Sequence, residues 1–220
     1  MDAYLANCLG LLRSGRPVIV LDLETTGLLP DWRNPPRVRP QTWEIGTIQR
    51  VRAGAGVVRT EARMVLNIGP LPEDLVAWNK SQGVELDPLI TVREGLNPGV
   101  ALAQLVRGVV GTILVGHNLT RFDARVLAGD LQAAGLAVPE ELANPALQVD
   151  TLIWAQTLWP VGAAGSPVNH QLATVAAFVG YDRGQGVFHQ ALDDTRATEA
   201  ILLAAYAETV RRERAETGAV

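Results

Sequence analysis

The sequence lacks most of the features that mark secreted and membrane proteins. Cys8 is its single cysteine, which excludes both a disulfide framework and a cysteine-rich zinc site. No apolar run approaches the length that crosses a bilayer. The first residues, with Asp2 and Asn7 among them, lack the basic and apolar regions of a signal peptide. We therefore expect a cytoplasmic protein with no membrane partner.

The chain also lacks an excess of basic residues, since its formal net charge is -4. A protein coated in basic surface is thereby excluded, and any contact with nucleic acid must use a local groove with a small footprint. No low-complexity segment divides the 220 residues, of which 48% are apolar. These properties predict one domain over residues 1–220, with a packing helix inside 1–16 and a fraying charged tail at 211–220.

The stretch Val18–Gly27 organises the rest of the chain. Its apolar, β-branched residues predict a buried strand, and the strand ends with Asp22 and Glu24 two residues apart, on one face. Carboxylates this close raise each other's pKa unless a cation lies between them. Alone, the stretch leaves two interpretations open: a cation site, or a strand that has ended with both acids solvated beside a turn.

Periodicity and turn residues predict the other elements. A strand, a glycine turn and a helix follow one another over 112–127, where Asn118 and Thr120 are candidate helix caps. Asp150 or Thr151 should cap another helix. The remaining predicted helices span 3–14, 73–80, 99–109, 171–179 and the C-terminal region, and the remaining predicted strands span 43–51, 57–66 and the residues just before 150.

One loop and two single residues have more than one interpretation when taken alone. The loop 28–40 holds Arg33, Arg37 and Arg39, which could meet phosphates, and Trp32, which could stack on a base. A solvated loop with one packed tryptophan fits equally well. Asp123 lies in a first helical turn, where the helix dipole favours an acid whatever the function. His117 could simply form a hydrogen bond within its turn.

Three motifs, taken in order, resemble those of the DEDDh 3′–5′ exonuclease family, which includes the proofreading subunits and domains of DNA polymerases. They are Asp22-x-Glu24-Thr25-Thr26-Gly27, then Gly116-His117-Asn118 with Phe122-Asp123, and then His189 five residues before Asp194. Between them lie further family landmarks, Glu44-Ile45-Gly46, Asp150-Thr151-Leu152 and His170-Gln171-Leu172.

The resemblance implies an α/β fold of the ribonuclease-H-like type. Its mixed sheet opens with an antiparallel meander, continues with parallel strands and carries helices on both faces. Asp22 and Glu24 would lie on the first strand, while Asp123 and Asp194 would come from helices. Four acids would then surround one point.

The same resemblance implies a metal-dependent exonuclease that releases 5′-mononucleotides from the 3′ end of single-stranded or frayed DNA. Two divalent ions, Mg²⁺ or Mn²⁺, would be held ~4 Å apart by carboxylates. Asp22 would bridge both ions, Glu24 and Asp194 would complete one site, and Asp123 would support the other. His189 would accept the proton of the attacking water. Asp193 is set aside, because the family spacing from His189 selects Asp194.

The residues that hold the terminal nucleotide follow from the resemblance too. They are Thr25, Thr26, Leu28, Asn118 and Phe122. For Leu28 and Phe122, ordinary core packing is the alternative.

Two other functions stay open. One is an exoribonuclease or short-oligonucleotide hydrolase of the same family, since nothing in the sequence reads a 2′-hydroxyl. The other is a non-catalytic protein of this fold that binds nucleic acid or a polymerase. The resemblance suggests roles in DNA replication and repair, either alone or beside a DNA polymerase.

Overall fold

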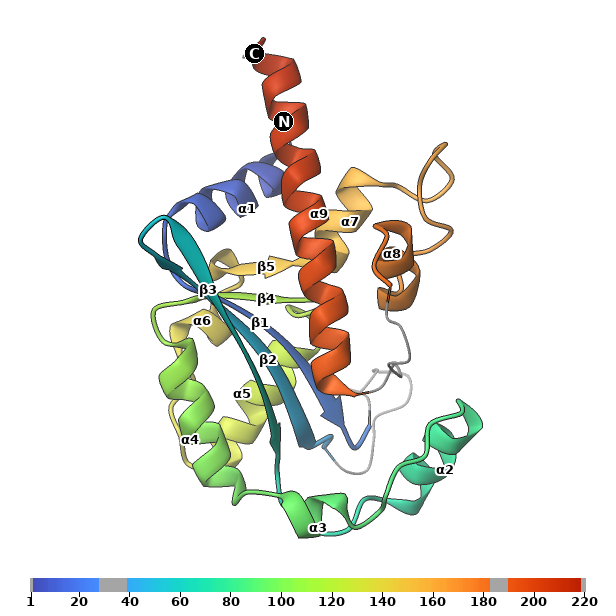
Figure 1. Ribbon diagram of the computed structural model, residues 1–220. Helices are drawn as coiled ribbons and strands as arrows, with labels where there is room; N and C mark the ends of the chain where they lie inside the picture. Colours follow the sequence, from blue (N-terminus) through green and yellow to red (C-terminus); the bar gives the residue numbers. More distant parts are fainter. Residues whose placement is uncertain (1, 28–38, 183–189, 219–220) are drawn as a thin grey trace.

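The computed structural model describes residues 2–27, 39–182 and 190–218. A five-stranded mixed sheet forms its centre, in the order β3-β2-β1-β4-β5 (Figure 1). The central strand β1 pairs antiparallel with β2, which pairs antiparallel with β3, whereas β4 is parallel to β1 and β5 to β4. The strands are β1 Val18–Thr25, β2 Thr42–Ala53, β3 Gly56–Val65, β4 Ile113–Gly116 and β5 Gln148–Asp150.

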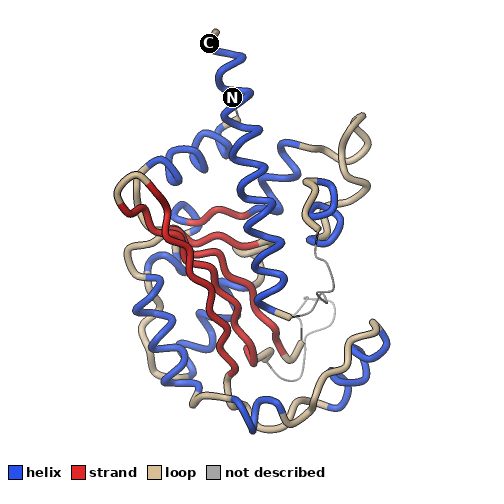
Figure 2. Tube along the Cα trace, viewed as in Figure 1, coloured by secondary structure: helices blue, strands red, loops and turns tan. Residues whose placement is uncertain are grey.

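The β2–β3 hairpin closes through a two-residue turn, because Ala53 is paired with Gly56. Tight turns of this length need a positive φ at the first turn residue, and Gly54 has φ +58. The predicted antiparallel meander is therefore present, and its turn lies inside the glycine-rich segment that the sequence indicated. Figure 2 shows the long hairpin strands running the length of the sheet.

Helices cover both faces of the sheet (Figures 1 and 2). Alternate residues of β1 enter two separate cores: Ile19 and Leu21 pack with the helices of one face, and Val20 packs with those of the other. The first face carries α4 Pro98–Val109, α5 Asp123–Ala133 and α6 Glu140–Ala143, and the second carries α1 Ala3–Arg13, α7 Thr151–Leu158, α8 Leu172–Phe178 and α9 Ala191–Thr217. The α/β fold class implied by the sequence is confirmed.

Three short elements complete the described chain. Between β3 and α4, α2 Glu73–Ser81 and α3 Ile90–Glu94 extend away from the sheet (Figure 1). The 3-10 turn η1 Pro145–Leu147 leads into β5. Within the described ranges, none of the helices combines the length and the apolar composition that crossing a membrane requires.

Candidate active site

Asp22 and Glu24 are half-buried and lie on one face of β1, as the strand period requires. They share the face of Val20, which is the face that α9 covers. On the neighbouring strand β2, Gly46 is the partner of Asp22 and Glu44 is the partner of Glu24. The two acids therefore point into the space between the central strand and the C-terminal helix.

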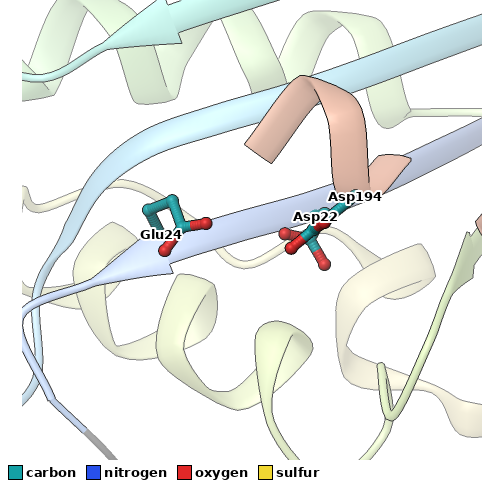
Figure 3. A group of neighbouring side chains, drawn as sticks. All are labelled: Asp22, Glu24 and Asp194. Carbon is teal, nitrogen blue, oxygen red and sulfur yellow. The ribbon is translucent and has the colours of Figure 1, made fainter. Parts of the chain in front are cut away.

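Asp194 enters the same space from the first turn of α9. Each of Asp22, Glu24 and Asp194 offers one carboxylate oxygen, and these oxygens all lie within 4.8 Å of one another (Figure 3). Asp193, the neighbour of Asp194, forms an ion pair of 2.6 Å with Arg196 instead. The family spacing from His189 selects Asp194 over Asp193, and in the structure it is Asp194 that lies beside the strand acids.

The acid cluster is electrostatically unfavourable by itself. Burial raises the pKa of Asp22 well above its ordinary value, and the negative charges of Asp123 and Asp194 raise this pKa further. Burial likewise raises the pKa of Glu24, and the charges of Asp194 and Glu44 add to the effect. Such a cluster holds its ionised form best when a cation lies among the carboxylates.

Asp123 is the first residue of α5 and is only 4% exposed. Burial raises the pKa of its carboxyl group to about 7, although hydrogen bonding to the backbone at Asp123 and Leu23 opposes the rise. Its charge contributes to the raised pKa of Asp22, so the two carboxyl groups interact electrostatically. It lies outside the group of three whose oxygens meet within 4.8 Å.

The turn that leads to Asp123 is held by a buried carboxylate, Asp150. Asp150 Oδ1 accepts hydrogen bonds of 3.0 Å from the backbone N–H groups of Asn118 and Leu152. Its Oδ2 accepts from the backbone N–H and the hydroxyl of Thr120, at 3.1 and 2.7 Å. Asp150, one of the two residues predicted as a cap, thus caps α7 and ties that helix to the turn.

The prediction that Asn118 and Thr120 cap the following helix was wrong. The cap position of α5 is Phe122, and it makes no side-chain cap hydrogen bond. Asn118 has φ 70, which shapes the turn, and the Thr120 hydroxyl is engaged by Asp150. The helix begins at Asp123, so Asn118 and Thr120 lie too early in the chain to occupy its cap position, and the Thr120 hydroxyl donates to the distant carboxylate of Asp150.

His117 links this turn to two other segments of the chain and is not confined to its own turn. Its Nε2 lies 2.9 Å from the carbonyl oxygen of His170, and its Nδ1 lies 3.0 Å from Thr151 Oγ1. Because a carbonyl oxygen only accepts, Nε2 carries the proton. Burial lowers the pKa of His117, which suits a neutral side chain with a structural role.

Two of the predicted substrate residues, Thr25 and Thr26, lie at the end of β1. The Thr25 hydroxyl donates to the carbonyl of Gly27 at 2.7 Å. Thr26 pairs with Gln41, whose backbone N–H donates to the Thr26 hydroxyl at 3.0 Å. Phe122 is half-buried against the α4–α5 core. The predicted residues Leu28 and His189, and with them Trp32, Arg33 and Arg37, lie outside the described residues.

Arg39 is the described arginine of the segment 28–40, and it makes a structural ion pair. Its Nη2 lies 2.6 Å from Asp130 Oδ1, and Asp130 Oδ2 accepts from the backbone N–H of Thr42 at 3.1 Å. Asp130 lies on α5 and is 8% exposed. The guanidinium thus already has a carboxylate partner that neutralises its charge.

Sequence reasoning missed one acid beside the cluster. Glu44 is 1% exposed and forms a two-pronged ion pair with Arg63, at 2.9 and 3.3 Å. Its charge contributes to the raised pKa values of Asp22 and Glu24. The sequence signal that could have identified Glu44 is its place in the Glu44-Ile45-Gly46 landmark. That landmark does not determine which face of the strand the Glu44 side chain occupies.

The order of this mixed sheet and the acids on its central strand are those of α/β domains of the ribonuclease-H-like type. E. coli exonuclease I in complex with a dT13 oligonucleotide matches with a TM-score of 0.62 at 16% identity, covering 91% of this chain and 42% of that chain. The zinc-bound E. coli exonuclease I complex with single-stranded DNA matches with a TM-score of 0.61 at 15% identity, covering 89% and 41%. Exonuclease I from Methylocaldum szegediense matches with a TM-score of 0.61 at 19% identity, covering 89% and 40%.

These likenesses establish the fold, and the chain spans less than half the length of those proteins. The sequence profile of the RNase T exonucleases matches residues 19–202. Because that range holds most of the chain, the protein belongs to this exonuclease family, and the family resemblance of the motifs is confirmed. No curated protein matches the sequence significantly.

Proposed function

We propose that this protein is a 3′–5′ exonuclease that hydrolyses single-stranded or frayed DNA and releases 5′-mononucleotides. The observation that carries the proposal is the meeting of the carboxylate oxygens of Asp22, Glu24 and Asp194 within 4.8 Å, in a chain of an exonuclease family. The substrate class is supported by two structures of similar fold, in which E. coli exonuclease I is bound to single-stranded oligonucleotides.

The donor set fits divalent cations. Carboxylate oxygens are hard ligands of the kind that Mg²⁺ and Mn²⁺ prefer, and crowding of these acids raises the pKa values of Asp22 and Glu24. Two ions would be held, with Asp22 shared, Glu24 and Asp194 completing one site, and Asp123 supporting the other. Such ions, when bound, activate water and stabilise the leaving oxygen.

The chain's own residues would orient the strand end and move the proton. Thr25, Thr26, Leu28, Asn118 and Phe122 would hold the terminal nucleotide beside the acids. His189 would accept the proton of the water whose oxygen attacks the last phosphodiester. The bond from phosphorus to the 3′ oxygen would break, so the phosphate would leave on the 5′ carbon of the released nucleotide, and the shortened strand would end in a 3′-hydroxyl.

Charge limits how the protein would hold its substrate. The net charge is -4, and Arg39 is paired with Asp130. Affinity would come mainly from the terminal nucleotide and its phosphates, with few cationic contacts along the strand. We therefore expect a shallow dependence of binding on salt and a distributive reaction.

The proposal is tested by digesting 5′-labelled single-stranded DNA, duplex DNA with a mispaired 3′ end, and RNA, each with EDTA, Mg²⁺ or Mn²⁺. A ladder that shortens from the 3′ side of DNA, and only with metal, is expected. Faster digestion of RNA would assign the exoribonuclease function. Cleavage of circular single-stranded DNA, or products with a 3′-phosphate, would contradict the proposal.

A matched pair of variants assigns the activity to the site. Asp194→Asn changes an acid of the cluster, and Asp193→Asn changes its neighbour, which pairs with Arg196. Loss of activity in the first variant and its retention in the second are expected. Loss in neither variant would move the reaction away from the cluster.

A further inference from the structure

The first turn of α9 lies directly against β2 at Gly46. A Cβ atom at Gly46 would lie 2.3 Å from the carbonyl oxygen of Ala191, 2.4 Å from its carbonyl carbon and 2.6 Å from the backbone nitrogen of Leu192. All three atoms belong to the backbone, so no side-chain rotation can relieve the overlap. Gly46 does not have a positive φ, and glycine is therefore needed here for space and not for backbone freedom.

This contact joins the two elements that carry the acids. Gly46 is the strand partner of Asp22, and Ala191 lies three residues before Asp194 in the same helix. The hydroxyl of Thr195, the residue after Asp194, donates to the carbonyl oxygen of Ala191 at 2.6 Å. The atom that a Cβ at Gly46 would displace is thus bonded to the turn that holds Asp194.

The rest of α9 is anchored independently of Gly46. Glu199 is 6% exposed and pairs with Arg50 at 2.5 Å and with Arg59 at 2.7 Å. Arg196 pairs with Glu61 at 2.6 Å, and farther along Ile201 is completely buried. A substitution at Gly46 would therefore push the first turn outward while the following turns stay attached to the sheet.

We propose that Gly46 is a positioning residue for the acid cluster. Because it lacks a side chain, the first turn of α9 rests on the backbone of β2, and this contact sets the distance between Asp194 and the strand acids Asp22 and Glu24. The inference rests on the proposed divalent-cation site. It assigns to Gly46 control of cation affinity through the placement of Asp194, and no contact with the cation or the substrate.

The test compares Gly46→Ala with Gly56→Ala. Gly56 begins β3, and a Cβ there would come no closer than 3.9 Å to the nearest atom, the carbonyl oxygen of Ala53. Mn²⁺ affinity is measured by titration calorimetry on DNA-free protein, and unfolding without metal is followed by circular dichroism. We expect Gly46→Ala to unfold cooperatively but to bind Mn²⁺ ~10–100-fold more weakly, the range seen when groups that orient metal ligands are changed. Gly56→Ala should bind Mn²⁺ like the parent.

A rescue variant separates placement from general damage. In Gly46→Ala combined with Asp194→Glu, the side chain is longer by one methylene and can reach back toward the cluster. Partial recovery of Mn²⁺ affinity is expected, whereas Asp194→Glu alone should not bind more tightly than the parent. Without recovery in the double variant, the loss would not come from the placement of Asp194, and the inference would be overturned.

Three further results would also overturn the inference that Gly46 positions Asp194. One is Gly46→Ala that binds Mn²⁺ with parental affinity, which would leave the proposed function untouched. The second is Gly46→Ala that does not fold without metal, since the contact would then serve the fold as a whole. The third is a parent that binds no Mn²⁺, which would remove the proposed site and this inference together.

Discussion

Thr120 donates two hydrogen bonds to one oxygen of Asp150, from its backbone N–H at 3.1 Å and from its hydroxyl at 2.7 Å. The other oxygen of Asp150 accepts from Asn118 and Leu152. One carboxylate, 1% exposed, therefore joins the end of β5, the cap of α7 and the turn before Asp123. The position of Asp123, the acid beside the cluster, depends on this connection.

Asp150→Asn should weaken the fold, because an amide nitrogen in place of one carboxylate oxygen cannot accept two of these hydrogen bonds. Buried hydrogen bonds to a charged group are the stronger ones, and we expect the free energy of unfolding to fall by roughly 2–4 kcal/mol in urea titrations. Asp193→Asn, which loses an ion pair near the surface, should cost under about 1 kcal/mol. If Asp150→Asn and Asp193→Asn lowered the free energy of unfolding equally, the hydrogen bonds of Asp150 would not be especially important for the fold.

Asp22→Ala should abolish metal-dependent hydrolysis while the protein stays folded. Burial and the neighbouring acids raise the pKa of Asp22, so its removal relieves repulsion, and the metal-free variant should be at least as stable as the parent. Activity is measured on end-labelled single-stranded DNA and stability by urea titration in EDTA. Full activity in this variant would exclude Asp22 from the site.

His189→Ala should reduce turnover ~10²–10⁴-fold, the range typical of a lost general base. Mn²⁺ affinity should change little, because the carboxylates and not the imidazole are the proposed ligands. In the parent, turnover should rise with pH through the titration of a histidine, and this rise should be absent from the variant. An alanine variant that keeps both the rate and the pH profile would transfer the role to another group.

Stability without metal should depend on the ionisation of Asp123. The pKa of this carboxyl is about 7 in the folded protein and about 3.9 in an unfolded chain. The folded state therefore holds the proton more tightly, so this group's contribution is complete below pH ~4 and is lost as the pH rises toward 7. Asp22 and Glu24 are shifted in the same direction.

Other carboxylates have the opposite pH dependence. The effect of Asp123 is therefore isolated by comparing the unfolding free energy of the parent with that of Asp123→Asn. Arg196 holds the pKa of Glu61 near 2, and Arg211 does the same for Glu208, so their contributions are lost as the pH falls below ~4. The free energy of unfolding of the parent minus that of Asp123→Asn, measured in EDTA, should decrease between pH 4 and 7. A difference that stays constant over this range would show that folding does not raise the pKa of Asp123.

Much of the site follows from sequence alone, because its parts are local. The two-residue period of a strand determines that Asp22 and Glu24 share a face, whatever surrounds them. Spacing within a family motif was enough to prefer Asp194 to Asp193. Turn residues likewise predicted the β2–β3 hairpin, and helix start and stop signals predicted α2 and α4, because such signals lie next to the elements that they bound.

Other features were decided only by the tertiary structure, because they join residues that are distant in the chain. Asn118 and Thr120 look like local caps until the carboxylate of Asp150 is placed beside them by the pairing of β4 and β5. Arg39 looks like a phosphate ligand until α5 brings Asp130 to it. The requirement for glycine at position 46 arises only because α9 packs against β2 there. Local conformation depends on neighbours in sequence, whereas these contacts depend on strand register and helix packing, which arise when the whole core forms at once.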